Sequence, residues 1–458
     1  MFDKKANDSL LFEMLSANQV QSLHLASLDI LECTGIRIEN RPALLMFEQA
    51  GASVNGNLVK IPAILVKTAL AAASERIVFL ASDNSRKVRL EKGVINYGAG
   101  CRTPYFTDPI TGEVRPTTIF DIENTGKIIQ SAKNIDFVSC VDLYPEQDAL
   151  SDLDCYKAIS SYCQKPVVFS AGDQESMKSI LEAAAGSSHI PYALAFSVKN
   201  EMPLIYSDSI VKQLFLCADA GIPVVFQPAV TAGLTGPAKL AGSLALGNAA
   251  SLAALVLHQM KRKGAPFIYG IDVTIKGQKR NCTGGPEVGM LSAAVGQLGE
   301  FYGLPTYCFS GISDSFSIDA QAGRESIYSI MLAALGGANL IYGNGMLGSG
   351  MIGSPGKILF DDECISFTNF FLDGIEYNED TLALDLIDRI GPGGNFVNEE
   401  HTFRYFKKET WYPDFLNRKP LKSWESGGSK TIEDLVAEKV SKILAAENSS
   451  QVTEQEGI

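Results

Sequence analysis

The sequence predicts a (β/α)8 barrel, because a short Val-, Ile- and Phe-rich run followed by an amphipathic stretch occurs eight times along the chain. Strands buried on both faces read as continuous apolar runs, and parallel strands need a covering helix between them. Eight such units in succession are typical of a closed barrel, whose active site lies where the strands end. The eight runs begin near Val94, Asp136, Pro166, Pro191, Ile222, Ala265, Leu304 and Ala338.

Residues 1–93 precede the first barrel strand and are expected to form a cap of helices and a hairpin. Apolar residues recur at helical spacing over 8–33, and two shorter helices are predicted over 42–49 and 62–73. Residues 76–92 alternate apolar and charged positions, which predicts two antiparallel strands. The barrel is expected to span 94–375.

A helix is expected after each barrel strand, and a Gly-x-Pro pattern at 221–223, 264–266 and 303–305 marks three of the helix ends. Residues 376–448 are predicted to be a helical extension packed on the barrel, including a helix over 432–445. The polar tail 449–458 is expected to be disordered. The aromatic side chains predicted to hold the extension against the barrel are Trp411, Tyr412, Phe415 and Trp424.

Composition restricts the possible partners. The 458 residues have a formal net charge of -13, which argues against a nucleic-acid partner. We expect no apolar run that approaches the ~20 residues needed to span a bilayer, and Met1–Leu10 lacks a basic, apolar secretory leader, so we expect a cytoplasmic protein. None of the nine cysteines is in a C-x-x-C pair, which indicates reduced thiols and no metal site.

Glycine-rich loops follow the first, fifth, sixth, seventh and eighth strands, and they are longer than a strand-to-helix connection requires. Glycine lets the backbone approach a ligand closely, although turns and helix entries would also use it. No phosphate-loop motif is present. The glycines predicted to approach a cofactor are Gly233, Gly311, Gly345 and Gly348.

Histidine is scarce: His24, His189, His258 and His401 are the only ones, and none is predicted at a strand end. A Ser/His/Asp triad and a His-ligated catalytic metal are therefore not expected. The reaction should need little proton transfer, or use a reactive centre brought from elsewhere. A barrel lyase or aldolase is an alternative, but no lysine is expected to close a strand and form a Schiff base.

Aromatic residues end several predicted strands. Because strand residues alternate between the two faces, about half should point toward the helices as ordinary core. The others could line a pocket for a quaternary ammonium, whose charge aromatic faces attract. The predicted substrate-binding residues are Tyr97, Arg102, Tyr105, Phe226, Gln227, Tyr269, Phe309, Phe316, Tyr342 and Met346.

Five segments, in order along about residues 10–440, resemble the trimethylamine methyltransferase family. They are "GAGCRTPYFTDPITGEVRPTTIFDI", "TAGLTGPAKLAGSLALGNA", "SDSFSIDAQAGRESIYS", "GNGMLGSGMIGSPGKILFDDE" and "TWYPDFLNRKPLKSWESGG". The resemblance implies a TIM barrel that transfers a methyl group from an amine to the cobalt of a separate corrinoid protein. We also expect a homo-oligomer.

The trimethylamine-specific members of that family carry pyrrolysine, which is absent here, so the chain resembles the non-pyrrolysine branch associated with quaternary amines such as glycine betaine. A quaternary nitrogen already has a neutral amine as its leaving group, so the protein mainly has to orient the methyl group and exclude water. Alternatives are another quaternary amine, such as proline betaine or a carnitine-like compound, or a barrel that binds such an amine without turnover.

The chain departs from many relatives at one position, where Gly348 replaces the glutamate of a "MLESG" sequence. A betaine carboxylate would need a basic or amide partner, and Arg102 and Asn344 come first among the candidates. The others are Gln227, Lys276 and Arg280. The predicted catalytic residues are Asn344, Gln321 and Asp314, while Asp319 is interpreted as the N-cap of the helix that begins at Ala320.

Overall fold

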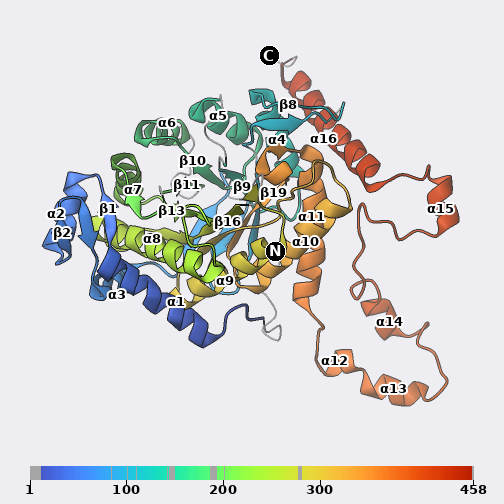
Figure 1. Ribbon diagram of the computed structural model, residues 1–458. Coiled ribbons are helices and arrows are strands. Elements are labelled where there is room, and N and C mark those ends of the chain that lie inside the picture. The colour runs from blue at the N-terminus through green and yellow to red at the C-terminus, as the bar shows by residue number, and fades with distance from the viewer. Residues whose placement is uncertain are drawn as a thin grey trace.

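The computed structural model describes residues 12–83, 85–100, 102–109, 111–141, 143, 150–185, 193–200, 202–276 and 281–455. The side chains of 276, 281–282 and 447–455 are not part of that description. Cys101, His189 and Arg280 therefore lie outside the described residues, as does the side chain of Lys276. A barrel ringed by helices forms the body of the molecule, and a helical segment extends from its side (Figure 1).

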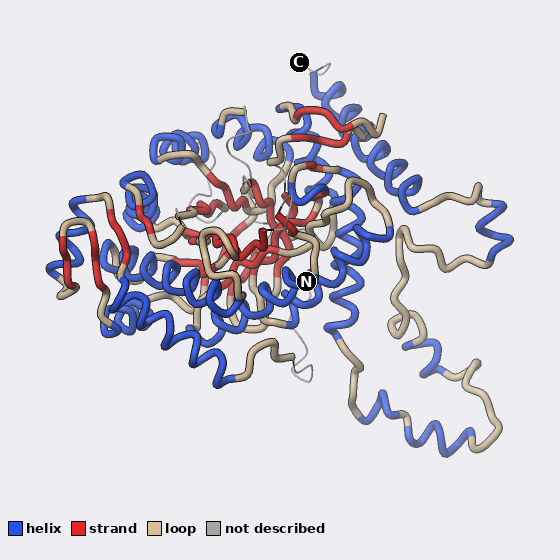
Figure 2. The backbone as a smooth tube through the Cα atoms, viewed as in Figure 1, coloured by secondary structure: helices blue, strands red, loops and turns tan. Residues whose placement is uncertain are grey.

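Eight parallel strands close into a barrel in sequence order, as the eight apolar runs predicted. The last strand pairs with the first, with a shift of register between Ile341 and Asn344. The red strands in the centre of Figure 2 are this barrel. They are β6 (Asn96–Gly100), β9 (Phe137–Cys140), β10 (Val167–Ser170), β11 (Leu194–Val198), β13 (Val224–Phe226), β15 (Phe267–Gly270), β18 (Thr306–Phe309) and β19 (Leu340–Asn344).

Alternate residues of these strands contribute to two separate cores. One core fills the barrel interior and includes Val168, Ile268 and Tyr307. The other lies between the strands and the helices and includes Phe169 and Phe267. The interior is therefore packed, and a ligand can bind only above it, where the strands end.

The covering helices alternate with the strands. Gly221 and Gly303 end α7 and α9 in the left-handed region, as the Gly-x-Pro pattern predicted. The helices are α4 (Ile119–Ser131), α5 (Asp152–Tyr162), α6 (Gln174–Ala185), α7 (Asp208–Ala220), α8 (Leu240–Lys261), α9 (Pro286–Tyr302), α10 (Ala320–Leu335) and α11 (Pro355–Asp373).

The expectation that no apolar segment is long enough to span a membrane was wrong, because helix α8 has the length and the apolar composition to do so. Most of its residues are buried inside the protein, where it packs beside α1 and α3. Burial in the fold explains its composition, since a helix that is apolar all round is found in the core of a large protein as well as in membranes.

The N-terminal cap combines two small sheets with three α-helices. The hairpin predicted over 76–92 is β4 (Ile77–Leu80) with β5 (Lys87–Leu90), and its Phe79 and Leu90 pack on the barrel interior. The hairpin therefore belongs to the packing below the strands. The other cap elements are α1 (Ala17–Asp29), a π-helical turn (Ile30–Thr34), β1 (Ile36–Ile38), α2 (Arg41–Gln49), β2 (Ser53–Asn55), β3 (Leu58–Lys60) and α3 (Ala63–Ala72).

Short strands in the loops after the barrel strands add small sheets to the fold. One contains β14, β16 and β17; another contains β7, β8, β20 and β21; and β12 joins the sheet of the cap. Their bounds are β7 (Tyr105–Thr107), β8 (Val114–Pro116), β12 (Ile205–Tyr206), β14 (Ala229–Ala232), β16 (Asp272–Lys276), β17 (Asn281–Cys282), β20 (Met346–Leu347) and β21 (Ile352–Gly353).

The C-terminal extension differs from the prediction, because only parts of it pack on the barrel. Residues 374–410, here called the arm, stand clear of the body (Figures 1 and 2). Trp411 and Phe415 do contact α11, whereas Tyr412 is exposed and Trp424 bonds to Lys430 within the extension. The helices are α12 (Glu379–Leu382), α13 (Leu384–Ile390), α14 (Glu400–Tyr405), α15 (Leu421–Ser426) and α16 (Ile432–Gln455).

Helix α16 also corrects the predicted disordered tail, since it continues past Ala445 to Gln455. Its first turns bury Val436 and Val440 in the same core as α11 and α4. This packing supplies a folded start from which the helix continues.

Candidate active site

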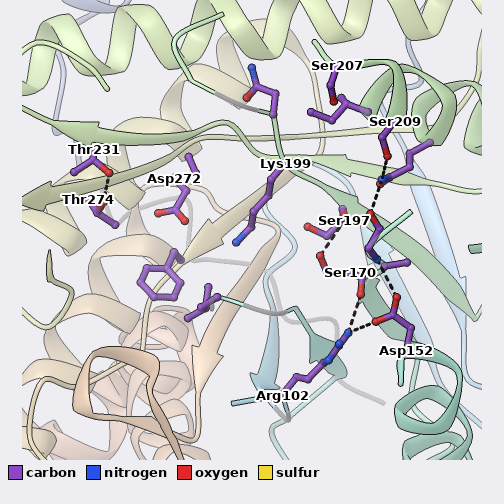
Figure 3. A pocket seen from close by; sticks show the side chains of 18 of the residues that line it. Arg102, Asp152, Ser170, Ser197, Lys199, Ser207, Ser209, Thr231, Asp272 and Thr274 are labelled. Atoms are coloured by element: carbon purple, nitrogen blue, oxygen red, sulfur yellow. Dashed lines mark hydrogen bonds and ion pairs between the residues drawn. The ribbon is translucent and has the colours of Figure 1, made fainter. Parts of the chain in front are cut away.

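A cavity of about 840 Å³ lies at the carboxyl ends of the barrel strands, the position expected for the active site of this fold. Arg102 follows β6, Ser170 ends β10, Ser197 is the next-to-last residue of β11, and Ser349 comes from the loop after β19. Polar side chains dominate the view into the cavity (Figure 3). Apolar walls are also present, formed by Leu143, Leu150, Ile210 and Phe309.

Lys199 and Asp272 place opposite charges at this cavity. Lys199 directly follows β11, Asp272 begins β16, and both side chains point into the space between the strand ends (Figure 3). Asp272 is 8% exposed, and no donor among the described residues lies within hydrogen-bond distance of its carboxylate. Burial raises the pKa of Asp272, and the charge of Lys199 offsets only part of that shift.

A second ion pair borders the cavity on the side of β6 and β10. Arg102 lies 2.8 Å from a carboxylate oxygen of Asp152 and donates to the carbonyl oxygen of Ser170 at 3.1 Å. Asp152 also accepts the backbone N–H of Gly172 at 2.9 Å. Both charges of this pair are thus satisfied by the protein, so Arg102 forms a wall of the cavity with its charge already balanced.

Buried polar atoms that face the cavity remain without a protein partner in the described part of the chain. They are both amide atoms of Asn200 and the hydroxyl of Ser197. An unsatisfied buried polar group costs about 1–3 kcal/mol. A polar ligand in the cavity would satisfy these groups, which makes them candidate contacts alongside Lys199.

The predicted aromatic pocket is only partly formed, because a single predicted aromatic lines the cavity. Phe309 does so, and its ring lies 5.1 Å from that of Tyr342 below it. Tyr342 stacks on Tyr307 at 4.1 Å and donates its hydroxyl to Gln227 Oε1 at 2.9 Å. Tyr342 and Gln227 therefore support the floor of the cavity from the barrel interior.

Three other predicted aromatics point away from the cavity, and strand alternation is the physical reason. Tyr97, Phe226 and Tyr269 belong to the core between strands and helices. Phe226 stacks on Tyr206, and Tyr269 donates to Asn248 of α8. Their predicted role in binding substrate is not supported.

Surface and loop positions account for the other predicted binding residues. Tyr105, at the start of β7, and Phe316, in the loop after β18, are exposed and lie outside the set that lines the cavity. Met346 is fully buried, and its side chain packs against Gly100 at the end of β6. Met346 thus fills space beside the strand ends.

The predicted catalytic residues occupy positioning roles. Asn344 is fully buried and donates to the carbonyl oxygen of Gly98 at 2.8 Å, which joins β19 to β6 where their register shifts. Asp314 accepts hydrogen bonds from Thr283 and Ser349, two residues that line the cavity. Burial would raise the pKa of Asp314, but these hydrogen bonds outweigh it and lower the pKa.

Gln321 and Asp319 lie further from the cavity. Gln321 is exposed and donates to Glu325 at 2.9 Å, so its assignment to the pocket is corrected. Asp319 accepts the N–H of Ala322 at 2.9 Å and is the N-cap of α10, as predicted. Glu325 in turn accepts from the backbone N–H of Asp314 and orders the loop after β18.

The glycines predicted to approach a cofactor have backbone reasons for being glycine. A side chain at Gly311, whose φ is 89°, would collide with Asn344, and one at Gly345, whose φ is 86°, would collide with Ile358. Gly233 and Gly348 also have positive φ, and Gly348 packs on Phe316. Close packing and turn geometry therefore account for these positions, and none of the four lines the cavity.

Sequence reasoning missed Lys199, Asn200 and Asp272. The statement that no lysine closes a strand was wrong, because Lys199 comes immediately after β11. A charged residue directly after a buried apolar run was the available signal, and the sequence contains it in "ALAFSVKN" and "YGID". The described histidines lie elsewhere: His24 in α1, His258 buried in α8 and His401 in the arm.

Comparison with known proteins gives the family. The family model described as trimethylamine methyltransferase (MTTB) matches residues 3–456. Trimethylamine methyltransferase MttB of Desulfitobacterium hafniense (strain DSM 10664 / DCB-2) is 31% identical over 446 residues, which cover 94% of this chain and 88% of that protein. Glycine betaine methyltransferase of Desulfitobacterium hafniense (strain Y51) is 31% identical over 424 residues, with 90% and 88% covered.

Solved structures support the fold. The Methanosarcina barkeri monomethylamine methyltransferase (MtmB) matches with a TM-score of 0.54 at 10% identity, covering 94% of this chain and 89% of that chain. Its fold likeness agrees with the closed parallel barrel described above. Because the sequence match extends over nearly the whole chain, this protein belongs to the trimethylamine methyltransferase family and is a methyltransferase.

Proposed function

We propose that this enzyme transfers a methyl group from glycine betaine to the reduced cobalt of a corrinoid carried by a separate protein. The observation that carries the proposal is the buried Asp272 carboxylate, which has no hydrogen-bond donor among the described residues and lies in the same cavity as Lys199. A buried carboxylate without donors is costly, and a bound cation would compensate its charge.

The charge pattern favours a zwitterion. Glycine betaine carries a trimethylammonium group close to a carboxylate, so it can place its cation beside Asp272 and its anion beside Lys199. Asn200 adds an amide donor for the anion. Phe309 supplies an aromatic face for the ammonium, an interaction of up to about 2 kcal/mol when water is excluded. Neutral trimethylamine would bring no cation to the buried carboxylate of Asp272 and no anion to Lys199.

The relatives support this choice of chemistry without deciding between substrates, since they include both a glycine betaine and a trimethylamine methyltransferase. The cavity falls within the ~300–1,000 Å³ usual for small-molecule sites. It is larger than so small an amine needs, and it opens at the barrel mouth, which leaves space for the acceptor to approach.

The reaction requires no proton. The bond between nitrogen and the methyl carbon breaks, its electron pair returns to nitrogen, and dimethylglycine leaves with a neutral tertiary amine and its carboxylate still ionised. A reduced corrinoid supplies the nucleophile that takes the methyl group. Asp272 and Lys199 hold the two ends of the substrate, so that one methyl group points out of the cavity toward the mouth. Phe309 keeps water from the cation.

The charge change also predicts how Asp272 acts. The nitrogen is positive in the bound substrate and loses that charge as the methyl group leaves. Asp272 therefore stabilises the bound substrate more than the transition state, so it should lower KM without raising kcat.

The test is an anaerobic assay of the purified enzyme with cob(I)alamin and a panel of amines: glycine betaine, proline betaine, carnitine, choline and trimethylamine. We expect dimethylglycine from glycine betaine, with a matching change in the visible absorbance of the corrinoid. A boiled enzyme sample is the control. If only another quaternary amine is turned over, that amine is the substrate in place of glycine betaine. If calorimetry detects betaine binding but no product forms, the barrel binds the amine without catalysing methyl transfer.

We also propose a cytoplasmic location. The cysteines whose state is described are free thiols, most of them buried, which suits a reducing compartment. Fractionation of cells that produce the protein would test this.

A further inference from the structure

The arm, residues 374–410, begins and ends on the same helix of the barrel. It leaves from the end of α11 at Asp373 and returns at Trp411, whose indole N–H donates to Ser366 at 3.1 Å. The carboxylate of Glu363 then accepts three successive backbone N–H groups of 414–416 at 2.6–3.0 Å. The arm is thus anchored to α11 at both of its ends.

Within the arm, polar groups bond to one another. Asp380 of α12 accepts from Tyr405 and Arg404 of α14, and its carbonyl oxygen lies 3.2 Å from His401 Nε2. These contacts join the first and last helices of the arm. They tie its helices to one another, and the backbone of the arm projects away from the barrel (Figure 1).

The largest apolar side chains of the arm, in contrast, point outward. Phe403 is 92% exposed, Ile375 88%, Tyr377 80% and Val397 77%. Leu384, Ile387 and Phe406 are also more than half exposed. A segment that exposes so many large apolar side chains is suited to burial against another protein surface.

The apolar area is large enough for a stable association. A Phe or Tyr side chain buries about 150–250 Å², and Tyr377, Phe403 and Phe406 are exposed over most of their surface. With the four aliphatic side chains, the arm approaches the ~800 Å² per partner of a standard interface. Permanent homodimer interfaces are the more hydrophobic class, whereas transient ones resemble ordinary protein surface.

The position of the arm argues against the methyl acceptor as its partner. Helix α11 starts beside the mouth, after β19, and runs back along the barrel to Asp373. Asp373 lies near Tyr97 at the beginning of β6, where burial and the charges of Asp136 and Asp373 raise the pKa of that tyrosine. The arm therefore starts at the end of the barrel opposite the cavity.

We infer that the arm packs against a second copy of this chain. The receiving surface is the exposed aromatic row on α11, formed by Phe367, Phe370 and Phe371, which is continuous with the start of the arm. In a two-fold dimer each arm covers the row of the other copy, so both apolar surfaces become buried at once. This inference is independent of the substrate and of the methyl acceptor.

The test compares the wild-type protein with an arm variant, Ile375→Asp/Phe403→Asp, and a control, Ile64→Asp, which changes an apolar side chain that is 63% exposed on α3 of the cap. Light scattering after size exclusion should give the wild type and the control at least twice the 49.3 kDa of one chain. The arm variant should have the mass of one chain and retain its circular dichroism spectrum and betaine turnover with free cob(I)alamin.

A wild-type mass of one chain at micromolar concentration would overturn the inference, as would an arm variant that keeps the wild-type mass. A mass that increases only when the corrinoid protein is added would assign the arm to that partner instead. Should the arm variant fail to fold, hydrogen exchange of the wild type decides: amides over 399–406 should exchange faster on dilution, and equal rates at all concentrations would contradict the dimer.

Discussion

Two lysine–aspartate pairs in this barrel differ in how completely the protein satisfies the hydrogen-bonding groups of the aspartate. Lys357 and Asp361, four residues apart on α11, are both fully buried and lie 2.6 Å apart. The ammonium of Lys357 also donates to Gly311 and Ser326, and Asp361 accepts the N–H of Gly345. At the cavity, Asp272 faces Lys199 but accepts no hydrogen bond from any described residue.

The difference separates a structural pair from a binding pair made of the same residue types. Burial raises the pKa of both aspartates, and in each case the lysine offsets part of the shift. Asp361 has protein donors on its carboxylate, and its contacts fix the turns that follow β18 and β19. Asp272 has no such donor among the described residues and so retains capacity for a cation. The hydrogen bonds that each carboxylate accepts, more than its charge or burial, therefore indicate whether the aspartate has a structural or a binding role.

The largest effect is expected from breaking the complete pair. Lys357→Met leaves the carboxylate of Asp361 buried without its cation, so the free energy of unfolding should fall by about 3–5 kcal/mol. Urea denaturation followed by circular dichroism measures this change. The double variant Lys357→Met/Asp361→Leu removes both charges and should recover part of the loss. A Lys357→Met protein as stable as the wild type would refute the structural role.

Breaking the incomplete pair should affect binding and leave the fold intact. Asp272→Asn keeps the size of the side chain but removes the negative charge, so the KM for betaine should rise at least about tenfold, or about 1.4 kcal/mol. The value of kcat should change less, because the substrate loses its positive charge during the reaction. Steady-state kinetics separates the two quantities, and an unchanged KM would remove Asp272 from the site.

The same variant has a pH signature. Because the folded-state pKa of Asp272 is raised, ionising it costs stability, and that cost grows as pH rises through the folded pKa. Asp272→Asn should therefore unfold at a higher temperature than the wild type at neutral pH. Betaine affinity of the wild type should fall as pH decreases through the raised pKa, and the variant should lack this dependence. Calorimetry at several pH values checks both.

The contrast between the pairs also explains what the sequence could predict. The barrel followed from eight apolar runs, since that pattern depends only on which strands are buried. Lys199 and Lys357 are both single lysines near apolar segments, and only their positions in the folded protein, one at the cavity and one buried beside α10, distinguish them. Tyr97 and Phe309 both lie in predicted strands, but the face on which each lies depends on a strand register that composition does not fix. The fold could therefore be predicted from the sequence, whereas the residues of the site could be identified only from the structure.

A third change tests whether the lysine of the incomplete pair selects the carboxylate of the substrate. Lys199→Gln keeps a polar side chain of similar length and removes the positive charge. Affinity for glycine betaine should fall by about tenfold, while affinity for tetramethylammonium, which has no carboxylate, should stay the same or rise as Asp272 loses its competing cation. Competition binding with both ligands measures this selectivity. An equal loss for the two ligands would assign Lys199 to general support of the cavity.

The smallest effect is expected at the cavity floor, where two phenylalanines on opposite faces of the barrel wall form a matched pair. Phe309→Leu keeps an apolar contact but removes the aromatic face, so betaine binding should weaken by about 0.5–1 kcal/mol. Phe226→Leu makes the same change in the core between strands and helices, where it should lower stability without altering affinity. Calorimetric titration of both variants with betaine decides the point. Equal affinities in the two variants would mean that the ammonium is held by Asp272 alone, because only one of the two rings borders the cavity.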